Sequence, residues 1–162
     1  MKAVDLVVKE QAIQSVIGPN GAGKTTLFNC ITGFYKPTIG RLLLAGSRGT
    51  YQLEQLDGYL IAQKAGVART FQNIELFENA TMLSNLLVGR HRHSTSQLWQ
   101  ELLFLPSVRA REKAHRRSVE QVIEFLDLEV YRDKLISGLP YGVRKVIELA
   151  RALCSEPKLI LL

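Results

Sequence analysis

One short segment combines glycines, a lysine and two threonines at a spacing that suits phosphate binding. Gly18-Pro-Asn-Gly-Ala-Gly-Lys-Thr-Thr26 matches the pattern G-x-x-x-x-G-K-[S/T], known as Walker A, in full. Backbone N–H groups of a glycine-rich loop converge on a phosphate only where side chains do not obstruct the approach, and Gly21 and Gly23 supply that freedom. The spacing therefore predicts a site for the phosphates of a nucleotide.

The other residues of the loop have separate expected roles. Lys24 places a cation on the β- and γ-phosphates, and the hydroxyl of Thr25 is the expected Mg²⁺ ligand. A helix that begins near Lys24 adds unpaired N–H groups and the positive end of its dipole. The predicted cofactors are ATP and Mg²⁺. The predicted nucleotide-binding residues of the loop are Asn20, Gly21, Ala22, Gly23, Lys24, Thr25 and Thr26.

The segments around the loop indicate which elements position it. Residues 12–17 are a short apolar run with β-branched residues, which predicts a strand leading into the loop. Apolar residues at helical spacing predict a helix after the loop that stops at Gly33. Further strands are expected over residues 39–45, 66–71 and 158–162.

From Thr81 onwards the apolar pattern is that of helices. Leu83, Leu86 and Leu87 share one face, and residues 119–126 and 143–153 give two more amphipathic helices. The order of strands and helices indicates an α/β fold. We expect one domain over 1–162, with core parts at 1–78 and 141–162 and a helical subdomain at about 79–140.

Composition narrows the class of protein without selecting a partner. The chain has 162 residues, two cysteines and a net charge of +6, and its longest apolar runs are only a few residues. These values suit one soluble domain in a reducing compartment and exclude a disulfide framework or a membrane span. Basic residues gather at 90–93 and 109–117, which more often marks a solvated helix face than a binding surface.

Three further motifs follow the loop in order. Arg69-Thr-Phe-Gln72 lies between the predicted core and helical subdomain, Leu139-Pro-Tyr-Gly-Val-Arg-Lys145 opens the last helix, and an apolar strand follows. With the Walker A loop, this series resembles the Q-loop, the signature and the start of Walker B in the ATP-binding subunit of an ABC transporter. The resemblance implies a P-loop NTPase fold of the ABC type, with a β-rich insert and a helical subdomain.

Two segments are similar to one subgroup of that family. Residues 27–38 and 66–77 look like the ATP-binding subunits of branched-chain amino-acid importers, as does the long helical insert at about 88–118. The resemblance implies an ATPase that powers amino-acid import from the cytoplasmic face of the plasma membrane, as a peripheral subunit. It also implies transmembrane permease subunits as partners and, indirectly, a solute-binding protein.

The family's mechanism assigns roles to further residues. Two such domains, identical or sister subunits, sandwich two ATP molecules between the Walker A loop of one chain and the signature of the other. Gln72 is expected to approach Mg²⁺ and the attacking water, as a catalytic and metal-binding residue, while its loop contacts the permease. The signature residues expected to bind ATP are Leu139, Pro140, Tyr141, Gly142 and Val143.

The sequence departs from the family pattern in three places. Pro140 stands where a serine usually contacts the γ-phosphate, and Tyr141 replaces a usual glycine. The family's Mg²⁺-binding aspartate and catalytic glutamate are expected after Leu162, and its adenine-stacking aromatic is missing from the N-terminal residues. We therefore expect a fragment, incomplete at both ends, that does not hydrolyse ATP at a useful rate alone.

Two other functions stay open on the sequence. A soluble ABC protein acting on nucleic acid or ribosomes would use the basic segments, and its affinity for DNA or RNA would fall with salt. A nucleotide-binding module without hydrolysis would need only the Walker A loop. The importer interpretation expects no nucleic-acid partner.

Overall fold

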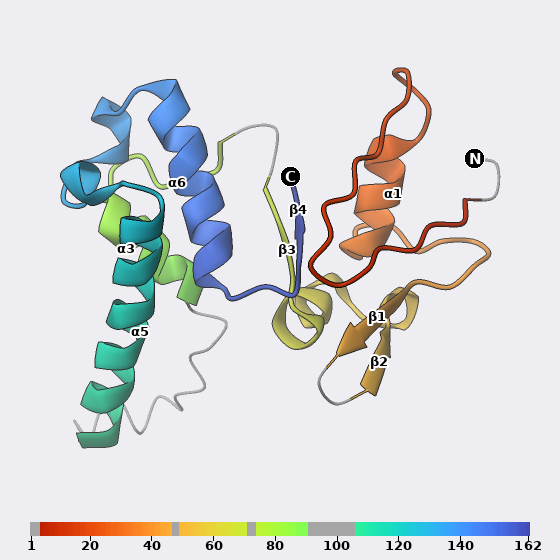
Figure 1. The fold of residues 1–162 in the computed structure, drawn as a ribbon, viewed down its shortest axis with the longest axis horizontal. Coiled ribbons are helices and arrows are strands. Elements are labelled where there is room, and N and C mark those ends of the chain that lie inside the picture. Colours follow the sequence, from red (N-terminus) through yellow and green to blue (C-terminus); the bar gives the residue numbers. More distant parts are fainter. Residues whose placement is uncertain (1–3, 47–48, 71–73, 91–105) are drawn as a thin grey trace. The chain divides into compact units, whose positions relative to one another are not determined.

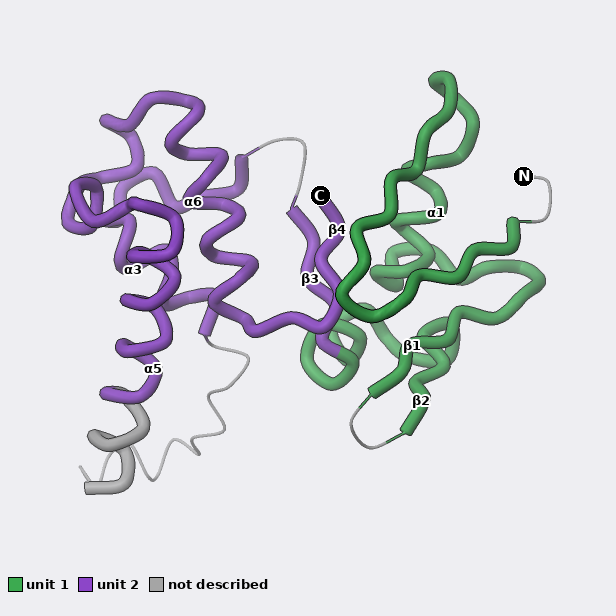
Figure 2. The backbone as a smooth tube through the Cα atoms, viewed as in Figure 1, with its two compact units in different colours: residues 1–65 green, residues 66–162 purple. Residues whose placement is uncertain are grey.

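The computed structural model describes residues 4–46, 49–70, 74–90 and 106–162. It forms two compact units, residues 1–65 and residues 66–162, which are described in turn (Figure 2). Gln72 and the basic residues at 91–93 lie outside the described residues. The predicted boundary between core and helical subdomain after residue 78 stays a prediction.

Unit 1 contains a helix and a β-hairpin. The hairpin strands are antiparallel, with Leu43 opposite Gln52 and Gly46 opposite Gly49. Beyond the hairpin, the chain turns helical, and Leu53, Ile61 and Ala65 are buried. The elements of unit 1 are α1 (Lys24–Ile31), β1 (Leu43–Gly46), β2 (Gly49–Gln52), η1 (Leu53–Gln55), α2 (Gly58–Leu60) and η2 (Ile61–Ala65) (Figure 1).

The structure confirms the predicted helix after the loop and shortens the predicted strand at 39–45. That strand begins only at Leu43, because its partner ends at Gln52 and the chain then enters a helical turn. The hairpin is secured at this end by Glu54, whose Oε2 accepts a hydrogen bond of 2.9 Å from the Leu42 N–H.

The predicted strand at residues 12–17 is wrong. These residues form no ladder with any other described segment, and Ile13 and Ile17 are 100% and 92% exposed. A β-branched composition favours a strand only where a partner strand takes up its backbone hydrogen bonds and its side chains find a surface to cover. Residues 12–17 have strand propensity, but no strand in the described structure pairs with them.

Unit 2 is mainly helical, with two short parallel strands. Val67 pairs with Leu159 and Arg69 with Leu161, so strands far apart in the sequence are neighbours. The three predicted helices are confirmed, and the predicted strands at 66–71 and 158–162 are present but shorter, with residue 71 outside the described residues. The elements are β3 (Val67–Arg69), α3 (Met82–Gly89), α5 (Pro106–Phe125), η4 (Glu129–Tyr131), η5 (Ile136–Gly138), α6 (Tyr141–Cys154) and β4 (Leu159–Leu161) (Figure 1).

The core of unit 2 lies where α3, α5 and α6 pack together. Their apolar stripes meet in one cluster, which the short segments η4 and η5 help to close. Its fully buried members show that the helical spacing in the sequence marked the correct faces. The largest of them are Met82, Leu86, Val119, Ile123, Ile136 and Ile147.

The end of α3 approaches α6 closely at Gly89. A Cβ atom at this position would lie 2.4 Å from the carbonyl oxygen of Arg151 and 3.2 Å from the Cβ of Cys154. The next residue, Arg90, is buried, and its Nη1 donates to the Cys154 carbonyl at 3.1 Å and to Glu156 at 2.5 Å. The absent side chain at Gly89 thus lets α3 and the C-terminal end of α6 meet backbone to backbone.

We predict that Gly89→Ala destabilises the chain by about 1–3 kcal/mol, because the new methyl group meets fixed backbone. Gly142→Ala is the matched control, since a Cβ there meets no described atom within 4 Å. Its helix propensity should raise stability by up to about 1 kcal/mol. Denaturant unfolding of both variants measures the difference, and equal stabilities would contradict the close approach.

Candidate functional site

The Walker A loop turns sharply through two glycines with left-handed backbone. Gly21 has φ 83° and Gly23 has φ 91°, a region that other residues rarely adopt. Between them, the N–H of Ala22 donates to the Pro19 carbonyl at 3.2 Å and closes the turn. This turn brings the chain directly from the loop into α1.

Lys24 folds back over the loop that precedes it. Its Nζ donates to the carbonyl oxygens of Gly18 at 2.6 Å and Pro19 at 2.8 Å. An ammonium group has three donors, so these two bonds leave one proton for a third acceptor. The loop therefore holds a positive charge at its own centre, with the capacity to bind an anionic oxygen.

The start of α1 offers backbone donors at the same place. The first intrahelical bond runs from the Leu27 N–H to the Gly23 carbonyl at 2.9 Å, so the preceding N–H groups have no carbonyl one turn before them. Gly23, the N-cap residue, has no side chain that could accept from them, and the first turn contains no acidic residue. Three orphan donors, the helix dipole and Lys24 together have the chemistry to bind an anion.

The donor chemistry of α1 also suits a magnesium ion carried by phosphates. Thr25 is exposed in the first turn, next to Lys24, and its hydroxyl is an oxygen ligand of the kind that Mg²⁺ takes. Within the described residues there is no group of three histidine, cysteine, aspartate or glutamate side chains that could hold a metal by themselves. The residues present fit an ion that arrives with the nucleotide.

The signature residues build a second helix start of the same kind. Pro140 is the N-cap of α6 with φ −58°, and its carbonyl accepts the first intrahelical bond, from Arg144 N–H at 3.1 Å. Proline has no side-chain acceptor, and the first turn of α6 contains no acidic residue. Tyr141 and Gly142 are exposed, whereas Leu139 is buried and anchors the approach to the helix.

The helix α3 shows what an ordinary helix start looks like in the same chain. Its N-cap Thr81 accepts a hydrogen bond at Oγ1 from the Ser84 N–H, at 3.2 Å. This arrangement satisfies one orphan donor within the protein, as most N-caps do. The starts of α1 and α6 therefore differ from α3 in keeping their donors available.

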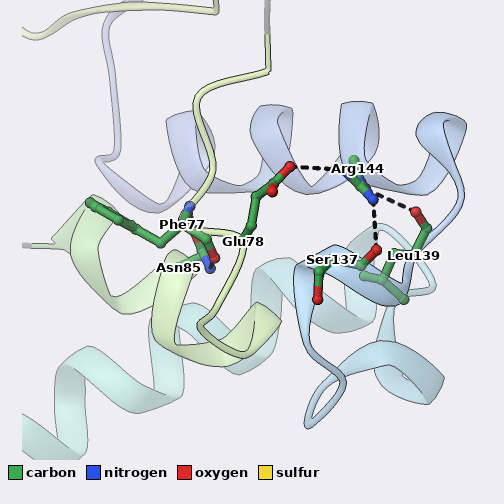
Figure 3. Close-up of polar contacts among 6 residues, drawn as sticks. All are labelled: Phe77, Glu78, Asn85, Ser137, Leu139 and Arg144. Atoms are coloured by element: carbon green, nitrogen blue, oxygen red, sulfur yellow. Dashed lines mark hydrogen bonds and ion pairs between the residues drawn. The ribbon is translucent and has the colours of Figure 1, made fainter.

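The segment that follows Gln72 in the sequence is fixed by a buried asparagine. Asn85 is completely buried in α3, and its Oδ1 accepts from the Phe77 N–H at 2.8 Å. Its Nδ2 donates to the carbonyls of Phe77 at 3.1 Å and Thr81 at 3.0 Å, and Figure 3 shows Asn85 beside Phe77. The ring of Phe77 itself is 58% exposed, so a rigid backbone presents an apolar side chain to the surroundings.

Sequence reasoning missed Asn85, Glu78 and Arg144. A polar residue on the buried stripe of a helix was a usable signal for Asn85, because such a residue needs partners that replace water. Nothing in the sequence marked the partners of Arg144, which lie in two segments, the turn at Ser137 and Leu139 and the segment that contains Glu78. The predicted residues of the Walker A loop lie in unit 1 and those of the signature in unit 2, and each group is described by itself.

A large pKa shift occurs at the C-terminal end of α6, the opposite end of that helix from the signature. Cys154, at the end of α6, is 1% exposed, and burial raises the pKa of its thiol to about 12. The thiol is therefore neutral at physiological pH and packs as a small apolar group.

The family model for ABC transporters matches residues 1–162. The chain belongs to the ABC transporter family. In the family's order, this ABC cassette matches the Walker A pattern at the start of α1 and resembles the family's signature at the start of α6.

Curated relatives of the cassette include two bacterial transport proteins. It is 39% identical, over all its 162 residues, to the high-affinity branched-chain amino acid transport ATP-binding protein BraF of Pseudomonas aeruginosa. It is 41% identical over 159 residues, or 98% of the chain, to LivG of Escherichia coli K12, which has the same description. The chain spans 62% of the length of the first relative and 60% of the second.

Solved structures show the same fold. The ADP conformation of an ATP-binding cassette of an ABC transporter aligns with a TM-score of 0.64 and 31% identity, over 89% of this chain and 54% of that one. In the part of the chain that the structure describes, no helix is both long and apolar enough to cross a membrane.

We predict that Asn85→Ala lowers the free energy of unfolding by about 2–4 kcal/mol, because it removes the three hydrogen bonds of a completely buried amide and leaves partly buried backbone groups of Phe77 without these partners. Ser84→Ala, an exposed substitution one position earlier on α3, is the control and should cost about 1 kcal/mol or less. Chemical denaturation measures both, and an Asn85→Ala variant as stable as the control would refute the role of the amide.

Proposed function

We propose that the cassette binds ATP with Mg²⁺ and, in the complete protein, hydrolyses it to power the import of branched-chain amino acids. The observation that carries the proposal is the pair of helix starts in family motifs that keep their N–H groups available for an anion. The names of the relatives, which are branched-chain amino acid transport ATP-binding proteins, support the substrate class.

The proposed roles follow from the chemistry of each segment. The Walker A loop, from Asn20 to Thr26, surrounds the β- and γ-phosphates, with Lys24 as the cation and Thr25 as a ligand of Mg²⁺. The residues from Leu139 to Val143 meet the γ-phosphate bound by a second ATPase subunit. Gln72 orients the attacking water beside the metal, as expected from the family resemblance.

The lost signature hydroxyl is compatible with this proposal. Proline at the N-cap of α6 removes a side-chain donor but leaves the backbone N–H groups of the first turn. Gly142 lies in that turn with no described atom near the position of a Cβ, so a phosphate can approach the backbone closely. The anion is then bound by backbone donors and the helix dipole.

Further partners belong to the same proposal. Transmembrane permease subunits would meet the loop that contains Gln72, and the exposed ring of Phe77 is an apolar contact suited to such a partner. The cassette would then lie as a peripheral subunit on the cytoplasmic face of the plasma membrane. A solute-binding protein would deliver the amino acid to the permease.

Uptake of labelled leucine tests the proposal directly. A strain that lacks the gene should take up leucine, isoleucine and valine slowly and recover when the gene is restored. Uptake of a basic amino acid serves as the control for a general membrane defect. Equal leucine uptake with and without the gene would contradict the proposed substrate class.

Lys24→Ala should weaken ATP binding by about 1.5–3 kcal/mol, the range for a lost hydrogen bond to a charged group. Lys36→Ala, which removes an exposed lysine from the same unit, is the matched control and should leave ATP affinity unchanged. Titration with a fluorescent ATP analogue measures both affinities. If the two variants bind alike, the Walker A loop does not hold the triphosphate.

Tyr141→Asp should change stability and ATP hydrolysis in opposite directions. A carboxylate in the first turn of α6 favours the helix by about 0.3–1 kcal/mol but repels a phosphate. We expect hydrolysis by the complete protein to fall by about tenfold or more. Thermal unfolding and phosphate release give the two readouts.

The control for Tyr141→Asp is Ser84→Asp, which puts the same charge in the first turn of α3. That helix start belongs to no proposed phosphate site, so hydrolysis should stay at the wild-type rate. A fall of equal size in both variants would show that the charge acts through the field of the whole protein.

A further inference from the structure

Arg144 connects three segments of unit 2 through one guanidinium group. Its Nε donates to the Leu139 carbonyl at 2.9 Å, and its Nη2 donates to the Ser137 carbonyl at 2.8 Å. Its Nη1 lies 3.2 Å from Oε1 of Glu78 (Figure 3). The side chain thus extends back from the first turn of α6 to the residues that lead into that turn.

The two carbonyl contacts hold the entrance to the signature. Leu139 directly precedes Pro140, which cannot donate from its backbone nitrogen and therefore contributes no bond of its own on this side. The guanidinium is planar and rigid, so bonds at Nε and Nη2 fix both the direction and the spacing of the two carbonyls. A flexible side chain with a single donor would leave the turn free to rotate.

The third contact reaches the segment that follows Gln72 in the sequence. The Glu78 carbonyl accepts from the Ser137 N–H at 3.1 Å, and Arg151 of α6 donates to the Glu75 carbonyl at 2.5 Å. Arg144 and Arg151 therefore join the segment with Glu75 and Glu78 to α6 at two places along the helix. The clamp of Asn85 on Phe77 keeps the same segment rigid from the other side.

The ion pair and the carbonyl bonds do not contribute equally. Glu78 is 66% exposed, and an ion pair in such a setting adds little free energy because water and salt screen it. The Arg144 side chain is only 25% exposed, and its bond to the Leu139 carbonyl is partly buried, whereas its contacts with Ser137 and Glu78 are exposed. The geometry of the entrance should therefore depend on the fork of donors more than on the partner charge.

We infer that Arg144 is a positioning residue for the signature: it holds the turn at Ser137–Pro140 so that the first N–H groups of α6 face a bound phosphate. The inference rests on the proposed function for its role in hydrolysis. The same residue links the signature to the segment after Gln72, so a partner that moves this segment moves the signature with it.

Three variants of the complete protein test the inference: Arg144→Ala, Arg144→Lys and Glu78→Gln. Arg132→Ala is the matched control, because Arg132 forms an ion pair with Glu120 elsewhere in unit 2, and that contact raises the pKa of its guanidinium. The first readout is amide hydrogen exchange over residues 137–143 without nucleotide. The second is kcat and KM for ATP, with ATP-analogue affinity measured alongside.

Arg144→Ala should speed exchange about tenfold at Ser137, Gly138 and Leu139, whose N–H groups are hydrogen-bonded in the turn, and lower kcat by about tenfold, the change for one lost charge-assisted hydrogen bond. ATP-analogue affinity at the Walker A loop should stay within about twofold. Arg144→Lys should behave like Arg144→Ala, because one ammonium cannot replace a fork of donors. Glu78→Gln should stay within about threefold of wild type.

Several outcomes would overturn the inference. Unchanged exchange in Arg144→Ala would show that the turn does not need the guanidinium. Wild-type exchange and kcat in Arg144→Lys would show that a positive charge is enough to hold the turn and that the fork of donors is not required. Equal losses of kcat in Arg144→Ala and Arg132→Ala would show a general stability effect. If the wild-type protein itself neither binds nor hydrolyses ATP, the proposed function fails, while the exchange result still decides whether Arg144 positions the turn.

Discussion

The first N–H groups of every α-helix lack a carbonyl one turn before them, and each helix must find them a partner. In this chain α3 uses the threonine at its N-cap, whereas α1 and α6 begin at a glycine and a proline, which have no side chain to accept. Neither of these helices has an acidic residue in its first turn. Side chains of the first turn therefore do not satisfy these donors, which is the basis of the proposed phosphate sites.

Under the proposed function, this constraint lets the signature differ from the family pattern and still bind a phosphate through its backbone. Backbone donors are present whatever the side chain, provided that the helix starts at the right residue and nothing covers it. Pro140 fixes the start because its ring sets φ, and the buried Leu139 fixes the approach. The rest of unit 2 then has to keep the turn at Ser137–Pro140, which precedes α6, in a fixed conformation.

The sequence predicted the helices well, because the apolar spacing of a helix and the residue that starts it lie within one short segment. Lys24, Thr81 and Pro140 mark such starts. It failed where the outcome depended on a distant partner. Residues 12–17 have strand propensity but no ladder among the described residues. Arg144 and Asn85 are important because of carbonyls on other segments. The residues of α3 and α6 do not show which carbonyls of other segments will accept these bonds. The sequence therefore predicted the Walker A and signature motifs but not the contacts that hold them.

The pairing of β3 with β4 forms late, because the two strands are far apart in the sequence. Thr70 and Leu161, which are 91 residues apart, bond at the edge of this ladder, so the strands close a loop that contains the whole helical block. Closing so long a loop is entropically unfavourable until α3, α5 and α6 have packed and shortened the distance. During synthesis, at about 5–20 residues per second, roughly 5–20 s pass between the synthesis of β3 and that of its partner strand β4. For that interval the backbone groups that β3 will share with β4 have no partner strand and can pair with another chain instead.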